Sequence, residues 1–239
     1  MDPLLTLLAA AVGYFCGAVS FARVVTRIVA PEKDITQREF TIPGIEETFQ
    51  VGTVGATAVA TEVGRKFGCL ASILDMLKVT VPTLAFKIWH PEASYFLIVA
   101  AMGVIGHNWP LYHRFRGGSG MSPIFGGMFV IDWIAVFVTS LGGMVLGLAV
   151  FKDFLMVYAS GVLLIIPWLW FRTHDWGHVA YGIVINIAFW GSQSPMLKKY
   201  IQLKREGKVN LSMAMQTSDM GRGMLKMATR LGLVKSDKA

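Results

Sequence analysis

Apolar runs long enough to cross a lipid bilayer recur along this sequence and constrain its fold more than any other feature. A helix that spans the hydrocarbon core needs about 20 mostly apolar residues. Runs of roughly that length occupy residues 4–29, 67–89, 95–112 and 154–171, and a shorter one occupies 176–190. The sequence therefore predicts an all-α integral membrane protein.

The composition places the chain in the same class. Hydrophobic residues make up 54% of it and charged residues only 15%, whereas a typical soluble domain has about 25% charged residues. The mean hydropathy is +0.54, and the net charge is +7 with a pI near 9.5. Lysine and arginine at the cytoplasmic face of a membrane protein explain this charge better than nucleic-acid binding does. No nucleic-acid partner is therefore expected.

Cysteine and histidine positions indicate neither a disulfide framework nor a metal centre. Cys16 and Cys69 both lie in apolar runs, so buried free thiols are expected. His174 and His178 are four residues apart, a spacing that would place both on one face of a helix. The break in the apolar pattern and Gly177 argue against such a helix, so no metal site is expected.

Residues 119–151 are too many for one ordinary span and too few for two. They form either one long tilted helix or a short half-helix followed by a span. Asp132 either serves a function within the membrane or marks the turn between the two parts. The clusters of basic residues beside the other spans fall on one side only if 119–151 crosses twice. The positive-inside rule then predicts seven crossings, with the N-terminus outside and the C-terminus in the cytoplasm, whereas six crossings would place the basic tail outside.

The chain is expected to divide into a transmembrane helical domain, residues 1–194, and a basic cytoplasmic tail, residues 195–239. The expected location is the bacterial cytoplasmic (inner) membrane, which the chain crosses several times. The tail carries apolar residues at helical spacing with cations between them: Met220, Met224, Met227 and Leu231, with Lys226 and Arg230. This pattern is typical of an amphipathic helix on an anionic membrane surface, and a frayed solvated tail is the alternative.

Two glycine-rich stretches lie at the cytoplasmic ends of predicted spans. "GHNWPLYHRFRGGSG", residues 106–120, follows the third run, and "VGTVGATAVATEVGRK", residues 51–66, ends a polar stretch, 30–66, that is predicted to be a loop. Consecutive glycines let several backbone N–H groups converge on one point, and an adjacent guanidinium adds charge and forked donors for a phosphate. Arginines that only snorkel to headgroups and glycines that only make a turn are the alternative. Together the two stretches predict one phosphate-bearing ligand held between them.

These stretches resemble the motifs of a known family, the bacterial acyl-phosphate:glycerol-3-phosphate acyltransferases. "VGTVGATAV", residues 51–59, is similar to the family's GSGNxGATN, and residues 106–120 are similar to GHxxPxxxxFxGGKG. "LDMLK", residues 74–78, and "GYFCGAVSFARVV" in the first run resemble further family patterns. The resemblance extends from about residue 10 to residue 125 and implies an integral membrane enzyme of phospholipid synthesis.

The chain departs from the family at several positions. Ser119 stands where the second motif has lysine, and Val51, Thr53 and Ala58 stand where the first motif has serine and asparagines. The third family motif, near HRENIKRLxxG, is not recognisable, and the closest text is "LKKYIQLKREG", residues 197–207. The scaffold is therefore better matched than the chemistry.

The resemblance implies transfer of a fatty acyl group from acyl-phosphate to the 1-hydroxyl of glycerol 3-phosphate, without a covalent acyl-enzyme or a cofactor. The protein would position two phosphates and stabilise charge that develops on the carbonyl oxygen and the leaving phosphate. Arg116 would replace part of the missing lysine's charge, and His107 and Asn108 would orient the site; a hydrogen bond to a backbone carbonyl is the alternative for His107. The candidate residues are, for catalysis, His107, Asn108, Arg116 and Ser119, and, for the phosphate loops, Gly52, Thr53, Gly55, Ala56, Thr57, Gly117, Gly118 and Gly120.

Two functions are open from the sequence alone. A working acyltransferase would act on acyl-phosphate and glycerol 3-phosphate, or a related phosphorylated acceptor, among membrane lipids. A catalytically inactive descendant would instead be a lipid-binding or structural subunit of a membrane-protein complex. Asp75 and Lys78, three residues apart in the second run, either tie helices together as a buried pair or contact the substrate.

Overall fold

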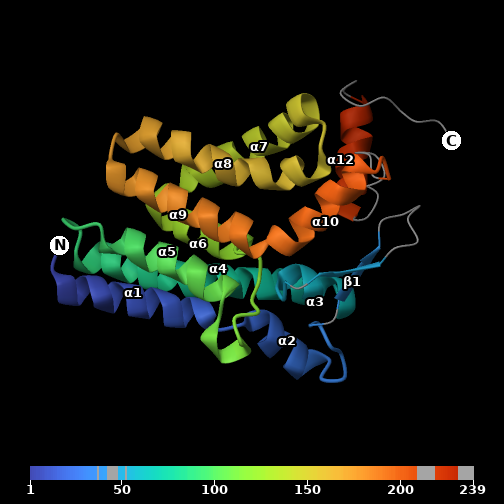
Figure 1. Cartoon of the computed structure of the whole chain (residues 1–239). Coiled ribbons are helices and arrows are strands. Elements are labelled where there is room, and N and C mark those ends of the chain that lie inside the picture. The colour runs from blue at the N-terminus through green and yellow to red at the C-terminus, as the bar shows by residue number, and fades with distance from the viewer. Residues whose placement is uncertain (37, 42–47, 52, 209–218, 231–239) are drawn as a thin grey trace. The chain divides into compact units, whose positions relative to one another are not determined.

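The computed structural model describes residues 1–36, 38–41, 48–51, 53–208 and 219–230, and most of them are helical (Figure 1). The chain divides into two compact units: Met1–Arg38 with Gly52–Val136 and Ile166–Ser194, and Glu39–Val51 with Phe137–Ile165 and Pro195–Ala239. The predicted helical architecture is confirmed. The elements are α1 (Pro3–Ala18), α2 (Phe21–Val29), β1 (Arg38–Thr41), β2 (Thr48–Val51), α3 (Ala56–Glu62), α4 (Arg65–Trp89), α5 (Tyr95–Asn108), a 3-10 turn (Leu111–His113), α6 (Met121–Ile131), α7 (Trp133–Val145) continued by a π-helical stretch (Leu146–Phe151), α8 (Phe154–Thr173), α9 (Trp176–Ser192), α10 (Ser194–Arg205) and α12 (Asp219–Arg230).

Some local expectations need correction. The stretch 30–66 is not only a loop, because β1 and β2 pair in a two-stranded sheet and α3 follows. Cys16 and Cys69 are free thiols, but neither is buried as expected: Cys16 is half-buried, and Cys69 is exposed beside the exposed Leu70 on the outward face of α4. The helix predicted in the tail is present as α12; its contact with a membrane stays a prediction, and Leu231 lies outside the described residues.

Three helical segments, Pro3–Val29, Arg65–Trp89 and Trp133–Phe151, are long and apolar enough to cross a membrane. Large apolar side chains on these segments face outward; Ile28, for example, is 76% exposed. Exposed apolar surface on this scale marks contact with lipid or another partner rather than with water. The division at residue 194 into a transmembrane domain and a tail stays a prediction.

The first apolar run is broken rather than continuous. α1 begins at Pro3, where the Asp2 side chain accepts a hydrogen bond from the Leu5 N–H at 3.0 Å, and it ends at Ala18. Val19 is extended, and the chain enters α2 only at Phe21. The carbonyl of Val19, which a continuous helix would use internally, instead accepts a hydrogen bond from a buried lysine on α4.

Residues 119–151 form a half-helix followed by a longer helix, which is the second of the two predicted arrangements. α6 ends at Ile131, and Asp132 is extended. Its carboxylate accepts hydrogen bonds from the Ile134 N–H at 3.1 Å, from Trp168 Nε1 at 3.0 Å and from Arg172 Nε at 3.1 Å. Asp132 therefore marks the turn, because it caps the next helix and binds α8.

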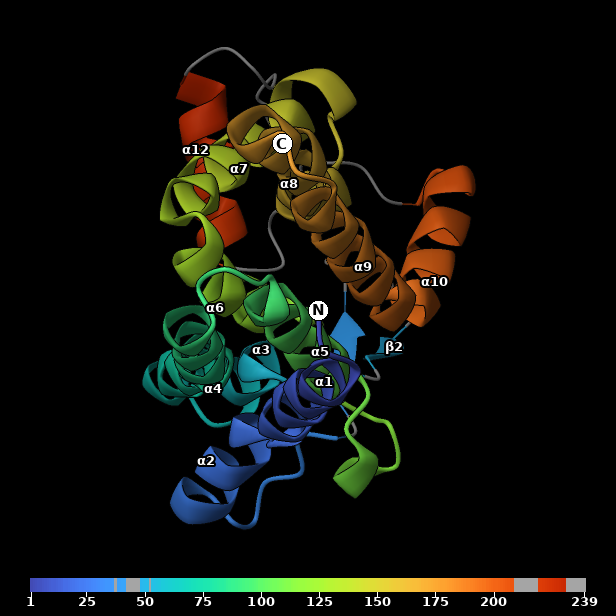
Figure 2. The same cartoon turned by 90° about the vertical axis from the view of Figure 1, so that its left-hand side faces the viewer.

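Glycines let α1 and α5 approach closely; α1, α4 and α5 lie side by side in both views (Figures 1 and 2). A Cβ added at Gly13 would lie 2.4 Å from the Val99 carbonyl oxygen, and one at Gly17 would lie 2.1 Å from the Gly103 carbonyl oxygen. A Cβ at Gly106 would lie 2.2 Å from the Tyr14 carbonyl oxygen. Such small-residue contacts are the usual means by which membrane helices pack backbone to backbone.

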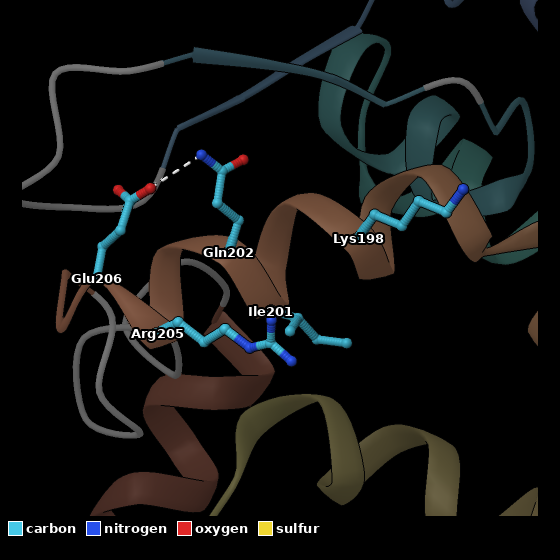
Figure 3. Close-up of a pocket in the computed structure, with 5 residues that line it drawn as sticks. All are labelled: Lys198, Ile201, Gln202, Arg205 and Glu206. Carbon is cyan, nitrogen blue, oxygen red and sulfur yellow. Dashed lines mark hydrogen bonds between the residues drawn. The ribbon is translucent and has the colours of Figure 1, made fainter.

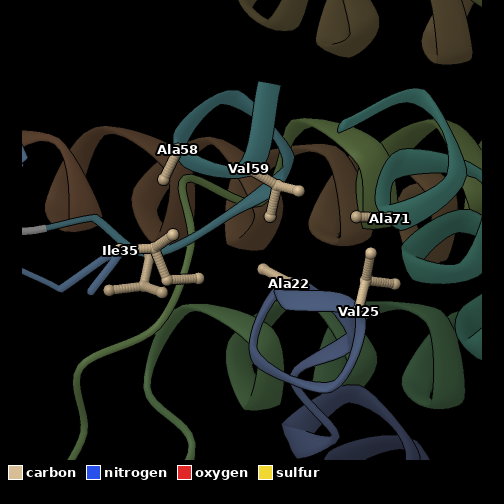
Figure 4. Packing of buried hydrophobic residues seen from close by; sticks show 7 residues of the cluster. Ala22, Val25, Ile35, Ala58, Val59 and Ala71 are labelled. Carbon is tan, nitrogen blue, oxygen red and sulfur yellow. The ribbon is translucent and has the colours of Figure 1, made fainter. Parts of the chain in front are cut away.

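A small apolar cluster holds α2 and α3 against α4 (Figure 4). Ala22 and Val25 of α2 face Val59 of α3 and Ala71 of α4, all at most 4% exposed. Val54, immediately before α3, belongs to the same cluster. The cluster therefore fixes the position of the first glycine-rich stretch relative to the second apolar run.

Candidate active site

The two glycine-rich stretches meet in space. The Val54 N–H donates a hydrogen bond to the Gly117 carbonyl, with an N···O distance of 2.7 Å. A Cβ added at Gly55 would lie 3.6 Å from the Gly118 Cα, which is ordinary contact distance. The predicted proximity of the loops is therefore confirmed.

The first loop presents small side chains and the start of a helix. Gly55 is the N-cap of α3, Ala56 is the first helical residue, and Thr57 is exposed. Thr53 is half-exposed, and Gly52 lies outside the described residues. Since the Val54 N–H is bound to Gly117, this N–H is not free to bind a ligand.

The second loop is more enclosed. Gly117, Gly118 and Gly120 are buried, and Ser119 is half-exposed. Gly120 has a φ of 88° and is the N-cap of α6, a left-handed conformation that favours glycine. Within the part of the chain that the structure describes, the N–H groups of Ser119 and Gly120 make no hydrogen bond, so both are available to an anion at the start of α6.

His107 and Asn108 lie behind this loop and are both buried. The His107 carbonyl accepts a hydrogen bond from the Gly118 N–H at 3.1 Å, and the ring Nδ1 lies 2.9 Å from Lys78 Nζ. The ring partner is thus an ammonium rather than the backbone carbonyl considered as an alternative. Asn108 Nδ2 donates to the Ala188 carbonyl at 2.9 Å, and its Oδ1 is buried without a partner among the described residues. Both residues lie against the loop glycines: a Cβ added at Gly118 would meet the His107 ring, and one added at Gly120 would meet Asn108 Oδ1.

Arg23, which the sequence placed only in a group of cytoplasmic cations, lies at the same loop. One of its terminal nitrogens donates to the Arg116 carbonyl at 2.8 Å, and the other donates to Ser20 Oγ at 3.2 Å. The Arg116 side chain itself is exposed. Partial burial, and then the charge of Arg23, lower the pKa of His113. The loop therefore has two guanidinium groups nearby, and the basic residue within "GYFCGAVSFARVV" was the available sequence signal for the second.

Asp75 and Lys78 form a buried pair below the loop. Lys78 Nζ lies 2.7 Å from Asp75 Oδ1, and the side chains are 4% and 1% exposed respectively. Lys78 also donates to the Val19 carbonyl at 2.5 Å. Of the two predicted roles, the contacts are those of a pair that ties helices together.

The end of α9 also reaches the site, which the sequence did not predict. Ser192 Oγ donates to the Ser119 carbonyl at 3.2 Å, and the Trp109 ring lies 3.4 Å from where a Cβ at Gly191 would be. Gln193 Oε1 is buried without a partner among the described residues. No sequence signal pointed here, because the family's third motif is not recognisable in this region.

Other polar features lie away from the loops. His178 Nδ1 lies 2.6 Å from Asp175 Oδ2, whereas His174 packs on Trp170. Among the described residues no three His, Cys, Asp or Glu side chains are grouped to hold a metal ion. A groove of about 390 Å³ runs along α10 in the second unit (Figure 3). It contains none of the predicted site residues; its lining is Lys198, Ile201, Gln202, Arg205 and Glu206.

Comparison with known proteins places this arrangement in a family. A family model described as glycerol-3-phosphate acyltransferase matches residues 7–202. A glycerol-3-phosphate acyltransferase from Mycoplasma mycoides subsp. mycoides is 26% identical over 218 residues, covering 79% of this chain and 78% of that protein. One from Pseudothermotoga lettingae is 28% identical over 135 residues, covering 52% of this chain and 61% of that protein. The chain thus spans about three fifths of the latter relative's length.

Solved structures show the same fold. Crystal structures of PlsY, an integral membrane glycerol 3-phosphate acyltransferase, in its glycerol 3-phosphate and lysophosphatidic acid forms, are similar to this chain with a TM-score of 0.66. The similarity covers 85% of this chain and 93% of the other, at 22% and 21% sequence identity. The family model covers most of the sequence, and the fold agrees with it. The chain therefore belongs to the glycerol-3-phosphate acyltransferase family.

Proposed function

We propose that this protein transfers a fatty acyl group from acyl-phosphate to glycerol 3-phosphate in the bacterial inner membrane, at the junction of the loops 53–57 and 117–120. The hydrogen bond from Val54 to Gly117 is the observation that carries the proposal, since it joins two anion-nest sequences into one surface. Family membership supplies the reaction class.

The chemistry needs positioning more than bond-making by the protein. The N–H groups of Ser119 and Gly120 bind phosphate oxygens at the start of α6, and Arg23 and Arg116 supply positive charge beside them. The acceptor hydroxyl attacks the acyl carbonyl and the carbonyl–phosphate bond breaks; the hydroxyl proton passes to the departing phosphate, which is released. Fixed donors stabilise the charge on the carbonyl oxygen and on the departing phosphate without reorganising.

Ser119 provides the first test. A lysine there would bring a full charge and up to three donors, whereas serine brings one hydroxyl. A hydrogen bond to a charged group contributes about 1.5–3 kcal/mol, so Ser119→Lys is expected to raise the rate about tenfold. The measurement is phosphate release from palmitoyl-phosphate by purified protein, with and without radiolabelled glycerol 3-phosphate, for both forms side by side. Acceptor-dependent release in neither protein defeats the proposed activity and favours a structural subunit.

We further propose seven crossings, with residues 195–239 in the cytoplasm and the N-terminus outside. In a form without Cys16 and Cys69, a cysteine replacing Arg205 is expected to resist a membrane-impermeant thiol reagent in intact cells. A cysteine replacing the exposed Glu92, between α4 and α5, is expected to react. Both positions are solvent-accessible, so the contrast reports the side of the membrane. Labelling at position 205, or its absence at 92, contradicts this topology.

A further inference from the structure

One ammonium group lies at the centre of the buried polar groups beneath the glycine loop. The Lys78 side chain is 4% exposed, and three acceptors surround its Nζ: the Val19 carbonyl at 2.5 Å, Asp75 Oδ1 at 2.7 Å and His107 Nδ1 at 2.9 Å. An ammonium has three hydrogens and no acceptor. Lys78 therefore hydrogen-bonds to the Val19 carbonyl and to His107 Nδ1, and it forms an ion pair with Asp75 Oδ1.

This arrangement favours one tautomer of His107. Because Lys78 can only donate, the ring Nδ1 must accept, and the imidazole is neutral with its hydrogen on Nε2. The Nε2 edge faces Gly118, since a Cβ added to that glycine would lie 2.1 Å from Nε2. The His107 carbonyl binds the Gly118 N–H as well, so both the ring and the main chain of His107 support the same loop residue.

The same ammonium also fixes the other side of the loop. By binding the Val19 carbonyl, Lys78 holds the break between α1 and α2, and Arg23 lies in the first turn of α2 with its guanidinium on the Arg116 carbonyl. Asp75 balances the charge of Lys78. Lys78 thus contacts both His107, at the end of α5, and Val19, at the break between α1 and α2, and residues 116–120 are held between these two places.

We infer that Lys78 is a positioning residue of the phosphate loop, which acts by holding His107 as the tautomer protonated on Nε2 and by fixing the α1–α2 break. The predicted loss of acyl transfer rests on the proposed function, whereas the predicted tautomer of His107 does not. It deepens the description of that site by adding a residue that does not itself touch the substrate.

The decisive variant removes Lys78 without leaving the Asp75 carboxylate buried and unpaired. Lys78→Met alone leaves a buried unpaired carboxylate and risks unfolding, so the double variant Asp75→Asn/Lys78→Met is used and its fold checked by size-exclusion chromatography. In the wild type, the imidazole ¹⁵N signals of His107, assigned by their absence in His107→Gln, are expected to show a protonated Nε2 and an unprotonated Nδ1. In the double variant they are expected to shift toward the other tautomer, and acyl transfer is expected to fall at least tenfold.

Lys87→Met is the matched control, because Lys87 lies on the same helix and donates to the Val130 carbonyl at 2.5 Å. It is expected to leave the His107 signals unchanged and the rate within about twofold. A protonated Nδ1 in the wild type, or unchanged His107 signals in the folded double variant, overturns the inference. Absence of acyl transfer by the wild type defeats the proposed function instead, and the tautomer of His107 still decides the role of Lys78.

Discussion

Gly118→Ala is expected to reduce acyl transfer about a hundredfold while the protein remains folded. The added methyl would lie 2.1 Å from Nε2 and 2.8 Å from Cε1 of His107, and the ring cannot swing away without breaking its contact with Lys78. Overpacking of this kind costs roughly 1–3 kcal/mol, and the loop that carries Ser119 is the part free to move. The measurement is acceptor-dependent phosphate release in parallel with size-exclusion chromatography.

The cause of this effect differs from what the glycine pattern alone suggests. From the glycine pattern alone, a side chain added at Gly118 would be expected to block the approach of phosphate to the backbone. In the structure, the added methyl group would instead collide with the His107 ring. Gly223→Ala is the control, because a Cβ there meets nothing within 4 Å, and its rate should equal that of the wild type. A folded Gly118→Ala protein with an unchanged rate shows that the loop is not where the phosphates bind.

Gly17→Leu is expected to prevent recovery of folded protein. Even the first added carbon would lie 2.1 Å from the Gly103 carbonyl oxygen and 2.8 Å from its Cα, and neither backbone atom can give way without separating α1 from α5. Helix pairs in membranes depend on such close contacts. Yield of monodisperse protein after detergent extraction, and its melting temperature, are the quantities to measure.

Phe15→Leu provides the comparison on the same helix, since Phe15 is 48% exposed and faces away from this contact. It is expected to give normal yield and a melting temperature within a few degrees of the wild type. A Gly17→Leu protein that is purified with wild-type stability contradicts the close packing of α1 on α5.

The parts of the site that could be predicted are those with a local chemical signature. Runs of glycine beside arginine predict an anion nest at residues 116–120 whatever the surrounding fold, and the charge pattern predicts that the stretch 51–66 lies on the same side of the membrane. Asp132 within an apolar run similarly predicted either a function within the membrane or a turn, and the structure shows the turn after α6.

The rest depends on contacts between distant segments and leaves no local trace. Val19 and Ser20 carry no pattern that predicts a break in an apolar helix, and the contacts found there, from Lys78 to the Val19 carbonyl and from Arg23 to the Arg116 carbonyl, join residues far apart in the sequence. Ser192 likewise carries no motif; its role follows from where the end of α9 packs. A local sequence pattern describes one segment, whereas these contacts each join two segments that are distant in the sequence.

The hydrogen bonds that hold the glycine loop join segments that the ribosome delivers at very different times. Asn108 and Ala188 are 80 positions apart, and Ser119 and Ser192 are 73 apart. At about 5–20 residues per second, the later partner follows the earlier one by roughly 4–16 seconds. Throughout that interval the nascent chain carries a complete glycine motif with none of its support from α9. The hydrogen bonds from α9 to the glycine loop can therefore form only after this late helix has been synthesised, long after the motif itself.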